Sequence, residues 1–182
     1  DDGENWQPLR LNMPATSIRD LVIKDDDVVV GTHGRSFWIL DDITPLRQIN
    51  TETKLAEALL FKPQLATRVK RSLHTDTPFP PEEPAGQNPP DGAIINYYLK
   101  APAASPITLE ITDASGRLVR RFSSDDKPLA VDTSKINPPE YWIRPFQPLK
   151  NESGMQRFVW DLLYPNPPSD QYDLPISAIY AD

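Results

Sequence analysis

Proline is the residue that most restricts what this chain can form. It supplies 21 of the 182 residues, about 12% against a usual share of about 5%, while glycine is scarce. Because proline lacks a backbone N–H and clashes with the preceding helical turn, it interrupts helices and central strands alike. Prolines spread along the whole length therefore exclude a helical bundle. They favour an all-β architecture of short strands joined by long extended loops.

Charge and residue usage narrow the range of partners. Asp and Glu number 26 against 19 Lys and Arg, a formal net charge of -7. An acidic chain repels phosphate backbones, so nucleic acid is not an expected partner. No apolar run approaches the roughly 20 residues needed to cross a bilayer, so no membrane span is expected. The absence of cysteine excludes disulfides, thiolate metal sites and a cysteine nucleophile.

Residues 1–44 are expected to form one sheet of consecutive hairpins. Runs rich in β-branched and aromatic residues at 17–23, 28–31 and 36–40 alternate with acidic or glycine-bearing turns. Three strands bury too little surface to be stable alone, and propeller blades stack side by side in rings of about four to eight. The pattern therefore indicates the remnant of a last propeller blade, with further blades upstream.

Residues 45–90 have the composition of a linker. A threonine start signal and one apolar face predict a short helix over Thr51–Leu60, and 65–71 is a candidate strand. The stretch 72–90 is too rich in proline to join a sheet interior. We interpret it as an exposed, partly polyproline loop.

Residues 91–182 are predicted to form a β-sandwich that is incomplete at its C-terminal end. Strands are expected at 93–99, 107–112, 117–122 and 155–162, with turn chemistry at 113–116 and a bulge in the strand that follows it. The alternation in the last strand directs Phe158, Trp160 and Leu162 inward, with Trp160 as a core anchor.

The opening residues resemble a known repeat. Asp1, Gly3 and Trp6 match the Asp-box pattern Ser-x-Asp-x-Gly-x-x-Trp, in which Gly takes the positive-φ corner and Trp packs the turn onto the blade. With the run from Val30 to Asp42, the segment resembles the closing blade of BNR-repeat propellers related to sortilin and to secreted glycoside hydrolases. The role of the Asp-box in that family is structural.

The second half carries a separate resemblance. The run Leu109–Val119 and the Trp160–Asp161 pair are similar to the Ig-like domain of flagellar hook-capping proteins and of many secreted bacterial modules. Together the two resemblances imply a secreted or periplasmic bacterial protein. They imply that its partners are the missing N-terminal blades and a polysaccharide or protein ligand.

His33 and Arg35 are the candidate binding residues. A His-Gly-Arg run at a strand junction can present two hydrogen-bond donors to a sugar hydroxyl or carboxylate at a propeller rim. The alternative is that Gly31 and Gly34 make a tight turn in which His33 and Arg35 pair with acidic neighbours. The alternative carries more weight on the sequence alone, so these residues are weak candidates.

No catalytic pair and no metal site are expected. Glycoside hydrolysis requires two carboxylates about 5 to 9.5 Å apart, whereas Asp41 and Asp42 are adjacent on a segment predicted to be extended and so point to opposite faces. His33 and His74 are isolated from each other, and the Asp25–Asp27 turn lacks the spacing of a calcium loop. We therefore predict no catalytic residue, metal or cofactor in this chain.

These observations favour a non-catalytic accessory region of an Asp-box propeller protein, in which a Pro-rich linker joins the last blade to the sandwich. Two alternatives stay open. One is a glycosidase-type hydrolase in which His33, Arg35 and a carboxylate such as Asp20 or Asp41 converge at the blade edge. The other is a sortilin-like propeller that binds a protein or peptide.

Overall fold

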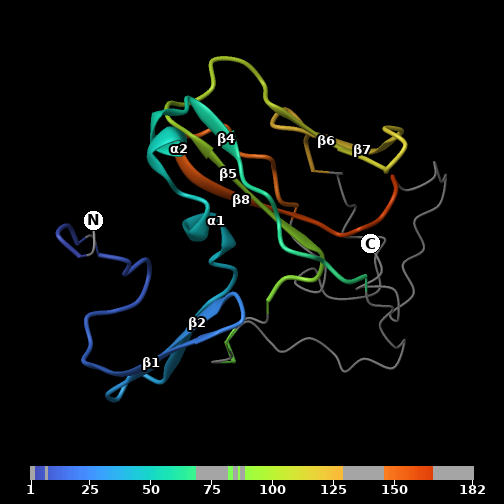
Figure 1. The fold of residues 1–182 in the computed structure, drawn as a ribbon. Coiled ribbons are helices and arrows are strands. Elements are labelled where there is room, and N and C mark those ends of the chain that lie inside the picture. Colours follow the sequence, from blue (N-terminus) through green and yellow to red (C-terminus); the bar gives the residue numbers. More distant parts are fainter. Residues whose placement is uncertain are drawn as a thin grey trace. The chain divides into compact units, whose positions relative to one another are not determined.

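A computed structural model gives the fold of the chain as an all-β protein with few helices (Figure 1). Small antiparallel sheets make up most of its regular structure, as the proline content predicts. The chain forms two compact units, residues 1–47 and residues 48–182. The structure describes residues 3–6, 8–68, 82–83, 86, 89–128 and 146–165.

The first unit is built on a three-stranded antiparallel sheet. Its strands are β1 (Ile18–Lys24), β2 (Asp27–Thr32) and β3 (Phe37–Leu40), and they lie in sequence order. This confirms the predicted series of hairpins. The two-residue loop between β1 and β2 has a φ of +52° at Asp25, a backbone region that Asp tolerates better than most residues.

Both faces of this sheet carry apolar side chains. Residues paired across strands share a face, and neighbours along a strand alternate between faces. The register therefore groups Val22, Val29 and Ile39 on one face, which also carries the charged residues Asp20, Lys24 and Asp27. The opposite face carries Leu21, Val30, Trp38, Ile23, Val28 and Leu40.

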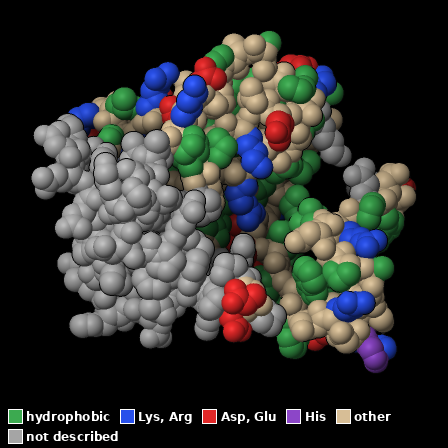
Figure 2. All heavy atoms as spheres, turned by 180° about the vertical axis from the view of Figure 1, so that it is seen from behind, with side chains coloured by type: hydrophobic (Ala, Val, Ile, Leu, Met, Phe, Trp, Pro, Cys, Tyr) green, Lys and Arg blue, Asp and Glu red, His purple; other side chains and the backbone are tan. Residues whose placement is uncertain are grey.

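No side chain of these three strands is buried within the chain. The buried residues of the first unit lie after the sheet, at Asp42, Ile43 and Pro45. Seen from behind, hydrophobic side chains reach the surface of the molecule at many points (Figure 2).

The Asp-box turn takes only part of its expected form. Gly3 has the positive φ, +91°. The Trp6 ring, however, is 87% exposed, and its indole N–H donates to the carbonyl of Gly3 at 2.7 Å. The expectation that Trp6 packs onto the sheet is therefore wrong for this chain, because the ring lies against its own turn. Asp1 is outside the described residues.

The segment that follows the first sheet differs from its prediction. Short helices form at α1 (Thr44–Arg47) and α2 (Thr51–Leu55), and a strand follows at β4 (Ala58–Leu60). The predicted helix is wrong beyond Leu55, because Ala58–Leu60 pairs with a strand of the second unit instead. In the predicted strand 65–71, residues 65–68 are not in a strand and the rest lie outside the described residues.

The second unit contains a sheet and a separate hairpin. The sheet has β5 (Ala93–Leu99) between β4 and β8 (Gly154–Trp160), all antiparallel. The hairpin joins β6 (Thr108–Thr112) to β7 (Leu118–Ser123). These strands confirm the predictions at 93–99, 107–112 and 117–122.

Two details of the second unit test finer predictions. Ile111 pairs with Arg120, whereas Thr112 pairs with Leu118. Val119 is therefore the extra residue of the predicted bulge. Leu162 has a φ of +63° beyond the end of β8, so its inclusion in that strand was wrong.

The core of the second unit lies between the β4–β5–β8 sheet and the hairpin. Phe122 of the hairpin approaches Phe158 of β8 with ring centroids 4.6 Å apart. Trp160 is partly buried against the same core, which agrees with its predicted role. The buried cluster consists of Ile95, Tyr97, Leu99, Leu149 and Phe158.

Candidate functional site

The loop between β2 and β3 holds both sequence candidates, His33 and Arg35. The Thr32 hydroxyl donates to the Ser36 carbonyl at 2.7 Å and accepts from the Arg35 N–H at 3.1 Å. The Arg35 carbonyl accepts from the Trp38 indole N–H at 2.8 Å. The backbone of the loop is therefore fixed by bonds to its own residues and to β3, while the side chains of His33 and Arg35 stay exposed.

His33 contacts a basic side chain. Nη2 of Arg19 lies 3.0 Å from Nδ1 of His33. Because a guanidinium only donates hydrogen bonds, Nδ1 of His33 can only be the acceptor in this contact. The His33 backbone is also tied to the start of β1, since its N–H donates to the Ser17 carbonyl at 2.9 Å.

The expectation that His33 and Arg35 pair with acidic neighbours is wrong. His33 pairs with Arg19 instead. Among the described residues, the ion pairs include neither Arg19 nor Arg35. This end of the sheet thus presents basic groups without a carboxylate partner in the described part of the chain.

Asp20 lies at the same end of the sheet as this loop. It pairs in register with Gly31, and a Cβ at Gly31 would meet Cβ of Asp20 at 3.7 Å and the Phe37 ring at 3.6 Å. The glycine lets these two side chains lie over the central strand. One oxygen of Asp20 accepts from the Leu21 N–H at 2.8 Å.

Asp41 and Asp42 lie at the opposite end of the sheet. They follow β3, whose four residues at about 3.3 Å each put roughly 13 Å of strand between them and the His33 loop. The structure therefore brings Asp20, but not Asp41, to the end that carries His33 and Arg35.

Asp42 also departs from the predicted extended backbone. Asp42 has a φ of +58° and is only 3% exposed. It accepts hydrogen bonds from both the N–H and the hydroxyl of Thr44 at the start of α1. These bonds form an Asx turn, which supplies hydrogen-bond donors to the buried carboxylate.

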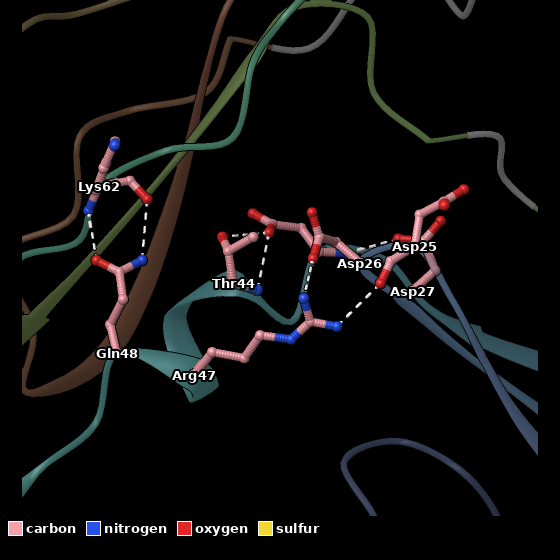
Figure 3. Close-up of polar contacts among 8 residues, drawn as sticks. Asp25, Asp26, Asp27, Thr44, Arg47, Gln48 and Lys62 are labelled. Carbon is pink, nitrogen blue, oxygen red and sulfur yellow. Dashed lines mark hydrogen bonds and ion pairs between the residues drawn. The ribbon is translucent and has the colours of Figure 1, made fainter.

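The Asp25–Asp27 turn joins β1 and β2 to helix α1 (Figure 3). Arg47 donates to the Asp26 carboxylate at 2.6 Å and to the Asp25 carbonyl at 2.9 Å. The carboxylate of Asp27 accepts from the Asp42 N–H at 2.9 Å. These acidic residues therefore have a structural role, and the described residues contain no group of acidic or histidine side chains placed to hold a metal ion.

Structural side-chain contacts in the second unit escaped the sequence reasoning. The Tyr97 hydroxyl donates to the Lys150 carbonyl at 2.6 Å and accepts from the Lys150 N–H at 2.9 Å, and burial raises its pKa. The Gln48 amide makes the same kind of paired contact with the backbone of Lys62 (Figure 3). Such contacts join residues far apart in sequence, so no local sequence pattern predicts them.

His74, the other histidine considered in the sequence analysis, lies outside the described residues.

Comparison with known proteins gives no relative from which a function could be carried over. No family model, curated protein or solved structure matches the chain. In the described part of the chain, no helix has the length and apolar character required to cross a membrane.

Proposed function

We propose that this chain is a non-catalytic accessory region of a secreted or periplasmic bacterial Asp-box propeller protein related to glycoside hydrolases. Its first unit would be the last blade of the propeller. The second would be an Ig-like β-sandwich that braces the propeller or presents it to a ligand.

The exposed apolar side chains on both faces of the β1–β2–β3 sheet carry this proposal. An antiparallel sheet with one solvated face alternates apolar and polar residues, whereas a sheet covered on both faces has continuous apolar runs. Leu21–Ile23 and Val28–Val30 are such runs. Leu21, Val22 and Ile23 are each more than half exposed within this chain. A sheet of this kind is stable when another layer packs on each side, which is the position of a blade between its neighbours.

The proposal is tested on the source polypeptide. We expect the reading frame upstream of Asp1 to encode further Asp-box repeats. A polypeptide that includes them should bind less of the apolar dye 1-anilinonaphthalene-8-sulfonate per chain than residues 1–182 do, because the added sheets cover the faces. An upstream region without such repeats, or undiminished dye binding, would reject the blade assignment.

A further inference from the structure

The end of the β1–β2–β3 sheet that holds Asp20 also carries three basic residues, which come from two different segments. Arg19 comes from β1, while His33 and Arg35 come from the β2–β3 loop, and all three are exposed. The Arg19 guanidinium lies 3.0 Å from the imidazole of His33. Arginine normally pairs with a carboxylate or phosphate, so a guanidinium held against another basic group leaves most of its donors available.

The position of Arg19 depends on an irregularity in β1. Ile18 pairs with Thr32 and Asp20 pairs with Gly31, so Arg19 is an extra residue with no partner on β2. Such bulges redirect a side chain and are frequent beside functional sites. Ser36, which closes the loop, has a φ of +60° although it is not glycine. The backbone is thus irregular on both sides of the basic group.

We propose that Arg19, His33 and Arg35 bind a tetrahedral oxyanion, the phosphate or sulfate group of an ester. The two guanidinium groups and a ring N–H of His33 supply more donors than the two oxygens of a carboxylate need, because one arginine fork saturates a carboxylate. A tetrahedral group offers three terminal oxygens to donors that come from different directions. The inference does not depend on the proposed function, since it uses only the Arg19–His33 contact and the exposure of the three residues.

Titration of the 15N-labelled chain with inorganic phosphate, inorganic sulfate and acetate tests this inference by NMR. Phosphate and sulfate should shift the amides of residues 32–36, and acetate should bind at least roughly fivefold more weakly. Whichever of phosphate and sulfate binds more tightly indicates whether the bound group belongs to a phosphate ester or to a sulfate ester. Arg19→Gln and Arg35→Gln should each weaken binding by about fivefold or more.

Arg68→Gln is the matched control, because it removes the same charge from an exposed arginine of the second unit and should leave binding unchanged. If Arg19→Gln perturbs the loop, the effect of Arg35→Gln on anion binding decides the test, since the Arg35 side chain makes no hydrogen bond or ion pair in the described part of the chain. Three results would overturn the inference: equal binding of acetate, binding that survives both substitutions, or no shift in the loop at tens of millimolar phosphate.

Discussion

At the scale of single residues, the Asp113 carboxylate organises the turn between β6 and β7. One of its oxygens accepts from the Ser115 hydroxyl at 2.6 Å and from the Arg117 N–H at 3.0 Å, and the other accepts from the Arg117 guanidinium. The hydrogen bond from the Ser115 hydroxyl, followed by those from Arg117, lowers the pKa of Asp113 from 3.8 to about 2.

This lowered pKa predicts a contribution to acid stability. A group whose pKa is lower in the folded state stabilises the fold above its unfolded pKa and loses that effect as pH falls through the folded pKa. The difference in unfolding free energy between the wild type and Asp113→Asn should therefore shrink from about pH 4 to about pH 2. Urea unfolding followed by circular dichroism at several pH values measures it. Parallel stability curves through this range would contradict the prediction. Ser115→Ala removes the hydroxyl that lowers the pKa of Asp113 most, so it should narrow the pH range over which the stability difference shrinks.

The Tyr97 hydroxyl links strand β5 to the backbone of Lys150 in the second unit. Its oxygen bonds both the N–H and the carbonyl of Lys150, beside the buried Leu149. Tyr97→Phe leaves both backbone groups without this partner, so we expect a loss of about 1–3 kcal/mol in the unfolding free energy.

Tyr98→Phe provides a matched control for that measurement. Tyr98 is the next residue of β5, lies on the other face of the strand, and makes no hydroxyl hydrogen bond within the described part of the chain. Its substitution should change the unfolding free energy by less than about 0.5 kcal/mol. Equal effects of the two substitutions would show that the bonds to Lys150 do not stabilise the fold.

At the scale of elements, the join between β5 and β8 depends on Gly92. This residue precedes β5, has a φ of +130°, and a Cβ there would lie 2.2 Å from the Trp160 carbonyl oxygen. Gly92→Ala must therefore move the backbone of one strand. We expect a loss of more than about 2 kcal/mol in the unfolding free energy.

The β6–β7 turn offers a control for Gly92→Ala. Gly116 also has a positive φ, +80°, but open space surrounds the position of its Cβ. Gly116→Ala should therefore cost only the backbone strain, about 1–2 kcal/mol. Denaturant unfolding of both variants measures their unfolding free energies. The difference between the two losses separates the cost of backbone strain from the cost of the clash with Trp160. A Gly92→Ala variant no less stable than Gly116→Ala would mean that β8 tolerates the displacement.

The same scale shows which elements could be predicted. Strands and turns defined by local patterns were found, including the bulge beside Arg120, because its side-chain phase is visible in the sequence. The helix over 51–60 failed in its second half because β4 gains a partner in β5, a contact that propensity does not include. For the candidate site, the sequence indicated His33 and Arg35. It missed Arg19, since its contact with His33 depends on the register of β1 and β2.

At the scale of the whole molecule, the two units differ in what stabilises them. The second unit has a buried cluster of five hydrophobic residues, whereas no side chain of the β1–β2–β3 sheet is buried. Small units that bury little apolar surface are marginally stable. Regions with few buried contacts also open with lower free energy than a packed core.

This contrast predicts two levels of amide protection in residues 1–182. In hydrogen–deuterium exchange, the amides of β1, β2 and β3 should exchange faster than the paired amides of β5 and β8, because opening the first sheet exposes little additional apolar surface. Ile95→Ala should speed exchange in β5 and β8 while leaving the rates in β1–β3 unchanged, since it creates a cavity in the second core only. Val22→Ala, a truncation in the exposed first sheet, serves as the reverse control and should leave β5 and β8 unaffected. Equal protection of both sheets, or a change in β1–β3 caused by Ile95→Ala, would show that the two units fold as one cooperative body.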